Sequence, residues 1–148
     1  MKIETILVPP DFSEDAYQAA EAAVEFAKRF DARIVLLHAY HVTVPIATPM
    51  GGGYALPPGF YDQLREQATA QIESAAKQLA ESGVKVTGIA SSEPASIAIT
   101  SEAERLPADL IVMGTRGLTG LKHVALGSAA ERVVRTARCP VMVVKSKS

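Results

Sequence analysis

The sequence predicts an α/β fold in which five parallel strands form one sheet with helices on both faces. Five short apolar runs alternate with four segments of helical periodicity along the 148 residues, and such alternation is typical of parallel sheets with right-handed crossovers. The second run, residues 34–39, is almost continuously apolar, as expected for a strand that is covered on both faces. A length of 148 residues suits one domain, so we expect residues 1–148 to form a single unit.

Composition and charge describe a soluble globular protein with no predicted membrane segment. Hydrophobic residues make up 48% and charged residues 21%, and no apolar run approaches the length of a membrane span. A net charge of -1 gives no general electrostatic reason to expect nucleic acid as a partner. The single cysteine, Cys139, excludes an internal disulfide and favours a buried apolar role over a reactive thiol. The amino terminus lacks the features of a signal peptide, so the expected location is the cytoplasm.

The first part of the chain is expected to contain two strands and one helix. Residues 3–8 form an apolar run that stops at Pro9 and Pro10, which cannot donate a ladder hydrogen bond. A helix is expected to begin after Asp11 or Ser13, because either side chain suits a helix cap and acids follow in the first turn. The second strand covers residues 34–39. The predicted buried stripe of the helix is Ala16, Ala20, Ala23, Ala27 and Phe30.

Residues 42–59 separate the second strand from the second helix. This segment is rich in proline and glycine and is long for a connection, so we expect it to be a flexible loop. Two interpretations are equally favoured, a flap over a ligand and a disordered surface loop.

The rest of the chain continues the alternation of helices and strands. A helix over residues 60–81 is expected to end before Gly83, a residue type suited to a left-handed turn, and Pro94 is expected in the first turn of the third helix. Strands are predicted at 84–90, 110–113 and 141–144, and the first of these is polar enough for a sheet edge. The predicted buried residues of the last two helices are Ala95, Ile99, Ala103, Leu106, Ala130, Val133, Val134 and Ala137.

Residues 114–128 form the stretch best suited to hold a ligand. They lie between an apolar run and a helical segment, with the spacing Gly114-x2-Gly117-x9-Gly127, followed by Ser128. Glycine lets the backbone approach a ligand closely, and the free N–H groups of a helix start favour an anion. The stretch lacks both the lysine of the GxxxxGK[ST] loop and the paired glycines of the GxGxxG loop. It therefore predicts a phosphate site of another kind.

Asp11 follows the first strand in the same way as the glycine stretch follows the fourth. In parallel α/β sheets, ligands bind outside the carboxyl ends of the strands, at the point where strand order reverses. If the first and fourth strands are neighbours, the two loops therefore face one crevice. Asp11 taken alone is better explained as a helix cap, and only its pairing with the glycine spacing favours a contact with a sugar. The sequence shows no metal-ligand spacing and no assignable Ser/His/Asp arrangement.

The chain resembles the universal stress protein family over essentially its whole length. The resemblance rests on Val-Pro-Pro-Asp-Phe-Ser after the first strand, Leu-Leu-His in the second, the glycine spacing after the fourth, and Cys-Pro-Val-Met-Val-Val near the end. It implies a Rossmann-like, adenine-nucleotide-binding sheet with the strand order 3-2-1-4-5. The complete glycine motif is that of the subgroup that binds ATP, so the implied ligand is ATP with Mg²⁺.

The resemblance also implies roles for individual residues. Asp11 would hold the ribose, and Gly127 and Ser128 would take the phosphates. The sequence departs from the family pattern at Pro10, where threonine is frequent, and at Ala130, where a hydroxyl residue often stands. The implied nucleotide-binding residues are Pro9, Pro10, Asp11, Ala39, Met113, Gly114, Thr115, Arg116, Gly117, Gly127, Ser128 and Ala129.

The implied function is a nucleotide-dependent regulatory role in the stress response, with at most slow ATP hydrolysis, in a homodimer. The last strand, made of Val141, Met142, Val143 and Val144, would pair with its copy in a second chain if it lies at the sheet edge. The alternative is an edge strand protected by the charged tail that follows it. Two other functions are open: an enzyme that uses ATP to adenylate a substrate, and a structural dimer that binds another small molecule.

Overall fold

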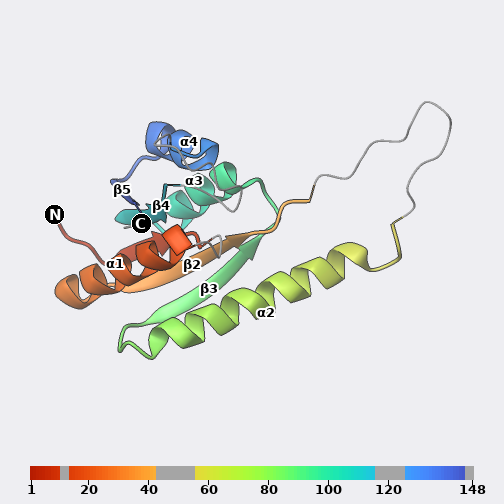
Figure 1. Ribbon diagram of the computed structural model, residues 1–148, viewed down its shortest axis with the longest axis horizontal. Helices are drawn as coiled ribbons and strands as arrows, with labels where there is room; N and C mark the ends of the chain where they lie inside the picture. Colours follow the sequence, from red (N-terminus) through yellow and green to blue (C-terminus); the bar gives the residue numbers. More distant parts are fainter. Residues whose placement is uncertain (11–13, 43–55, 116–125, 146–148) are drawn as a thin grey trace.

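The computed structural model describes residues 1–10, 14–42, 56–115 and 126–145, which Figure 1 colours along the sequence. Strands and helices alternate along these residues, as the apolar runs predict. The bounds are β1 Thr5–Val8, α1 Glu14–Phe30, β2 Arg33–Ala39, α2 Phe60–Ala80, β3 Val86–Ser91, α3 Ala95–Arg105, β4 Leu110–Gly114, α4 Ser128–Thr136 and β5 Val141–Val144.

The strands form one parallel sheet in the order β3-β2-β1-β4-β5. This confirms the order that the family resemblance implies, and it places the polar strand β3 at one edge, as predicted. β5 lies at the opposite edge. The chain builds outward from β1 to β2 and β3, and then returns to the other side of β1 for β4 and β5. The strand order therefore reverses between β1 and β4.

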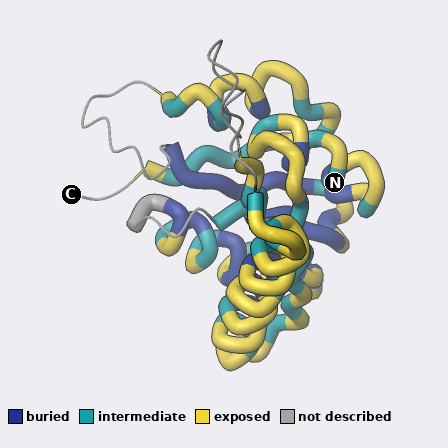
Figure 2. The backbone as a smooth tube through the Cα atoms, turned by 90° about the vertical axis from the view of Figure 1, so that its right-hand side faces the viewer, coloured by how far each residue is buried: buried dark blue, intermediate teal, exposed yellow. Residues whose placement is uncertain are grey.

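Each face of the sheet carries two helices. α1 and α2 cover one face, and α3 and α4 cover the other (Figure 1). Successive strand residues point to opposite layers, so that Ile6 and Ile34 pack with α1 and α2, whereas Leu7 and Val35 pack with α3 and α4. Figure 2 shows buried strands at the centre and exposed outer sides on the helices. This is the doubly covered sheet that the apolar runs predict.

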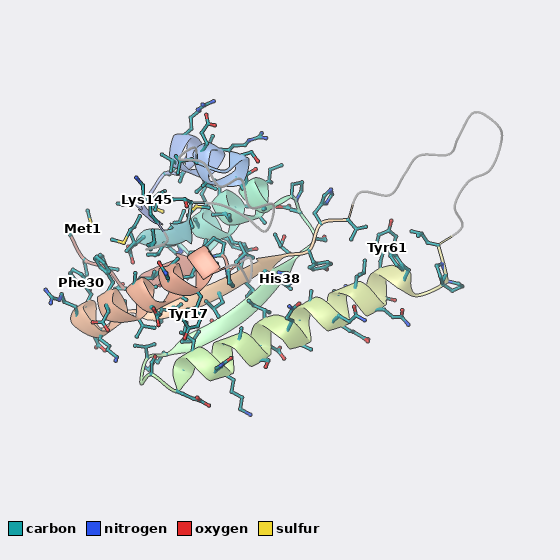
Figure 3. The ribbon with its side chains drawn as sticks, in the orientation of Figure 1. Met1, Tyr17, Phe30, His38, Tyr61 and Lys145 are labelled. Atoms are coloured by element: carbon teal, nitrogen blue, oxygen red, sulfur yellow. The ribbon has the colours of Figure 1, made fainter. Side chains whose placement is uncertain are left out.

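The buried stripe of α1 differs from the prediction at its end. Ala19 is fully buried, Ala20 is half-buried, and Phe30 is 41% exposed. Phe30 is the last residue of α1 and stacks on Phe26, with 6.1 Å between the ring centroids; Figure 3 shows it at the far end of the helix. The apolar periodicity of the sequence therefore continues beyond the part of the helix that the sheet covers.

The last two helices also bury fewer of the predicted side chains. Ala95 is exposed and Ala98 is buried in its place, because Ala95 is the first residue of α3. Val134 is 46% exposed, since α4 turns only Ala130 and Val133 fully into the core. Both differences arise because a short helix touches the sheet along a narrow stripe.

Several element boundaries shift by one or two residues from their predicted positions. β1 begins at Thr5, although Ile3 before it is still buried. β3 begins at Val86 and extends to Ser91. Pro94 is the cap residue of α3 and so precedes its first turn. Gly83 has the predicted left-handed conformation, with a φ of 97°.

α2 lies unusually close to β3 at a single glycine. A Cβ atom added to Gly88 would lie 2.8 Å from the carbonyl oxygen and 3.0 Å from the carbonyl carbon of Ile72. These are backbone atoms of α2, and they cannot rotate away as the end of a flexible side chain can. Ile72 is fully buried. Gly88 therefore sets the distance at which α2 covers the edge of the sheet.

Most of the predicted 42–59 loop lies outside the described residues, which resume at Leu56. Gly59, at the end of that loop, has a φ of 80° and immediately precedes α2. Among the described helices, none is both long and apolar enough to span a membrane.

Candidate functional site

The first and fourth strands are neighbours, so the segments that follow them leave the same edge of the sheet. β1 pairs with β4 at Ile6↔Leu110 and Leu7↔Ile111. Beyond these pairs, β1 ends at Val8 and the chain runs on through Pro9 and Pro10, while β4 stays paired with β5 as far as Gly114↔Val144. Pro9 and Pro10 have no N–H group with which to extend the β1–β4 ladder. The described ends of the two strands are thus free to separate at the point where strand order reverses, which is where α/β sheets bind ligands.

β2 reaches further toward this edge than β1 does. Val8, the last residue of β1, is level with Leu36, and β2 continues to Ala39. Ala39 is half-buried and Met113 of β4 is 6% exposed, and both pack in the layer of α3 and α4. The structure therefore brings the ends of β2 and β4 to the same face, on either side of β1. Met113 is mainly a core residue, and little of its surface is available to a ligand.

A hydrogen bond joins the two described ends of the glycine stretch. The Gly127 N–H donates to the Thr115 carbonyl oxygen at 2.6 Å. Thr115 is 9% exposed and directly follows β4, and Gly127 is the cap residue of α4. The end of β4 and the start of α4 are therefore held together, although the residues between them in sequence are not all described. This is the strand, loop and helix order that the sequence predicts.

The amino end of α4 presents backbone N–H groups toward the same edge. Gly127 provides no side-chain cap, and the first hydrogen bond of the helix runs from the Glu131 N–H to the Gly127 carbonyl oxygen at 2.9 Å. The N–H groups of Ser128 and Ala129 precede that bond and have no partner within the helix. Such groups, together with the helix dipole, favour an anion by roughly 0.3–1 kcal/mol for each favourable charge. The exposed Ser128 hydroxyl adds a further donor.

Among the described residues, the acidic side chain nearest to this helix start is paired with a basic one. Glu131, in the first turn of α4, forms an ion pair with Arg135 one turn later. This pairing reduces the repulsion that the carboxylate exerts on an incoming phosphate. Arg132, beside Glu131, is exposed and has no ion pair within the described part of the chain.

Nine of the twelve predicted nucleotide-binding residues lie in the described structure, at the edge built by β1, β2, β4 and α4. Pro9, Pro10, Ala39, Met113, Gly114, Thr115, Gly127, Ser128 and Ala129 are these nine. Asp11, Arg116 and Gly117 lie outside the described residues.

His41 makes a contact at this edge that sequence reasoning did not identify. Its Nδ1 lies 2.9 Å from the carbonyl oxygen of Ser92, and because a carbonyl only accepts, Nδ1 carries the proton. The bond ties the end of β2 to the segment between β3 and α3. The two residues are 51 positions apart, so no local pattern in the sequence could have indicated it.

His38, one residue before Ala39, gives the fold a predicted dependence on pH. Burial lowers the pKa of its imidazole from the ordinary value of 6.5. The neutral ring is therefore favoured by folding, and its contribution to stability is present above the unfolded pKa and is lost as the pH falls below it. We expect the urea midpoint to fall more steeply between about pH 7 and pH 5.5 in the unchanged protein than in His38→Gln. If the urea midpoint depended on pH equally in the two proteins, burial of His38 would not have this effect on stability.

Cys139 behaves as the sequence predicts for a small apolar residue. It is half-buried and packs with the layer of α3 and α4. Burial raises the pKa of its thiol, so the reactive thiolate is disfavoured. Within the described ranges, no group of three or more His, Cys, Asp or Glu side chains is arranged to hold a metal ion.

A separate hollow of about 790 Å³ lies at the opposite edge, near the amino ends of the strands. The Asp109 carboxylate there accepts the N–H groups of Glu4 and Thr5 at 2.9 and 3.0 Å, and the Arg33 Nε donates to the Thr5 hydroxyl at 3.0 Å. Acidic and basic side chains line the hollow together. These contacts join the starts of β1, β2 and β4. The acidic and basic side chains that line the hollow balance one another, so the hollow has no excess of one charge that would attract a ligand.

Comparison with known proteins agrees with this geometry. The model of the universal stress protein family matches residues 2–145. Universal stress protein MJ0531 of Methanocaldococcus jannaschii is 39% identical over 141 residues, which are 95% of this chain and 81% of that protein. The solved structure of hypothetical protein MJ0577 from the same organism has a TM-score of 0.83 at 30% identity, covering 100% of this chain and 99% of the other. A universal stress protein of Archaeoglobus fulgidus, solved in complex with dAMP, shares the fold at 20% identity and a TM-score of 0.65, covering 98% and 100%. The chain therefore belongs to the universal stress protein family.

Proposed function

We propose that this protein binds ATP together with Mg²⁺ at the carboxyl edge of β1, β2 and β4, and that occupancy of this site regulates its interactions in a stress response. The observation that carries the proposal is the bond from the Gly127 N–H to the Thr115 carbonyl oxygen. It holds both ends of the glycine stretch beside the strand that leads into Asp11. That a relative of the same fold has been solved with dAMP supports an adenine nucleotide as a ligand that the fold can hold.

The proposed contacts extend from the adenosine end of the nucleotide to its phosphates. The adenosine lies along Pro9, Pro10 and Ala39, with Asp11 on the ribose. Met113 and Gly114 border the base and the sugar.

The phosphates occupy the region in front of α4 in this proposal. The N–H groups at the start of the helix, which have no partner within the helix, and the Ser128 hydroxyl favour their negative charge. In this proposal Gly117 and Gly127 leave room for the phosphates, and Thr115 and Arg116, which precede Gly117 in the sequence, complete the phosphate-binding stretch. Ser128 and Ala129 supply the donors.

Regulation fits the site better than rapid catalysis. Glu131 is the acid in the first turn of α4, and it is engaged with Arg135 rather than free to act as a general base. We therefore expect ATP hydrolysis to be slow. We also propose the cytoplasm as the place of action, with residues 1–148 acting as one domain.

Mass spectrometry of the small molecules that copurify with the native protein tests this function against its alternatives. ATP or ADP recovered in proportion to protein would support the proposal. A covalent adenylate of another metabolite would support an adenylating enzyme, and an unrelated molecule in the same proportion would support a structural dimer with another ligand. Either of the last two results would overturn the proposal.

We further propose a homodimer through β5. The Ile111 N–H donates to the Pro140 carbonyl oxygen at 3.0 Å, so Met142, two residues on, also turns its backbone groups toward β4. Val141 and Val143 then direct their N–H and C=O groups away from the sheet, at an edge where no strand of the described chain lies. A second copy of this edge would satisfy them.

Val143→Pro tests the dimer without breaking the ladder to β4. Proline removes the outward N–H, and edge strands tolerate it. We expect light scattering after size exclusion to show a dimer for the unchanged protein, a larger monomer fraction for Val143→Pro, and a dimer for Val143→Thr, which keeps the N–H. A monomer in the unchanged protein at all concentrations would contradict the proposed assembly.

A further inference from the structure

The two helices on one face of the sheet are separated by a groove. α3 and α4 pack against one another, whereas α1 and α2 leave between them a hollow of about 310 Å³. Leu36 of β2 is part of its lining, Ala20 of α1 and Ala75 of α2 face it from the two sides, and Pro10 lines it as well. The small alanine side chains do not interlock, so the space between the helices stays open.

The rim of this groove carries an aromatic ring and a carboxylate on adjacent turns. Tyr17 and Glu21 both line the groove and are four residues apart on α1, so they lie on the same side of the helix. Tyr17 is 66% exposed, and Figure 3 shows its side chain on the side of α1 that faces α2. Neither side chain has a hydrogen bond or an ion pair within the described part of the chain. Both groups are therefore available to a ligand.

The charge near the groove favours a cation. Glu21 is the only acidic side chain among the described residues that line the groove, and Lys145, which borders an adjoining hollow with it, forms no ion pair with it. Gln78 of α2 faces the groove as a neutral hydrogen-bonding group. An aromatic face beside a carboxylate, over an apolar floor, is the combination that recognises an ammonium group on an apolar body.

We propose that the groove between α1 and α2 binds a small arylalkylammonium cation. The aryl group occupies the apolar hollow between Ala20, Ala75 and Leu79. The ammonium group lies between the Tyr17 ring and the Glu21 carboxylate. A volume of about 310 Å³ is at the lower end of ligand pockets, so the ligand has one ring rather than several. This site does not depend on the proposed ATP site, with which it shares only the lining residue Pro10.

Phenethylammonium tests the proposal, with 2-phenylethanol as a matched uncharged probe. Amide NMR titrations of the full chain should show saturable shifts for residues of α1 and α2 that line the groove. We expect the ammonium to bind about threefold to tenfold more tightly than the alcohol, since each exposed charge or cation–π contact is modest. Glu21→Gln should abolish this preference. Glu25→Gln, on the same helix but outside the groove, should leave it unchanged.

Three results would overturn the proposal. The first is the absence of saturable shifts at the groove with phenethylammonium in the millimolar range. The second is equal affinity for the ammonium and the alcohol, which would leave an apolar hollow without cation recognition. The third is an equal loss of preference in Glu21→Gln and Glu25→Gln. Because Tyr17 and Glu21 are exposed, their substitution does not threaten the fold, and Tyr17→Leu provides a second variant that should also reduce the preference.

Discussion

Replacing Gly127 by valine should abolish ATP binding in a protein that remains folded. Gly127 has a φ of -59° and a ψ of 157°, which any L-residue adopts without strain. Its N–H bond to Thr115 is also kept in the variant. The branched side chain would instead occupy the space in front of the Ser128 and Ala129 amides, which is the proposed path of the phosphates. We expect a loss of affinity of at least about 100-fold, or roughly 3 kcal/mol.

Calorimetric titration with Mg²⁺ and ATP measures this loss, and circular dichroism checks the fold. Gly127→Ala adds one methyl group and should have an intermediate effect. Ser101→Val places the same side chain at an exposed position of α3, and should bind as the unchanged protein does. Normal binding by a folded Gly127→Val protein would show that the phosphates do not approach the start of α4.

Replacing Gly88 by alanine should cost more stability than the same replacement at Gly59 or Gly83. The added Cβ would lie 2.8 Å from the Ile72 carbonyl oxygen, so α2 as a whole must move away from β3. Overpacking of this kind costs roughly 1–3 kcal/mol. Gly59 and Gly83, in contrast, have open space around them, and their cost comes only from positive φ angles.

Urea unfolding of Gly88→Ala and of Thr87→Ala measures this effect. Thr87 is the exposed neighbour of Gly88 in the same strand, so its variant controls for general changes in β3. We expect a clearly lower urea midpoint for Gly88→Ala and a small change for Thr87→Ala. A Gly88→Ala midpoint equal to that of the unchanged protein would mean that α2 and β3 adjust without cost.

Most of the fold could be predicted from the sequence because its parts have distinct local patterns. The apolar run at 34–39, the proline pair after β1 and the polar character of β3 each indicate an element or its place. The apolar periodicity of a helix does not indicate how much of its length is covered by the sheet. Phe30 and Val134 are exposed for this reason, although both continue an apolar pattern.

The candidate site shows a similar division. The glycine spacing predicted a phosphate loop, but the order of the strands came from the family resemblance and not from any local pattern. The closure of Thr115 onto Gly127, the bond from His41 to Ser92 and the close approach at Gly88 join segments that lie apart in sequence. Such contacts depend on the folded arrangement of the strands, so the sequence alone could not reveal them.

The most direct test of the central claim is calorimetric titration of nucleotide-free protein with Mg²⁺ and ATP. We predict a saturable heat corresponding to one site per chain, since each chain contributes its own β1, β4 and α4. Protein first shown by mass spectrometry to be free of nucleotide is essential, because a retained ligand would hide the heat. No heat of binding from such protein at high concentration would contradict the proposal that this member of the universal stress protein family binds ATP.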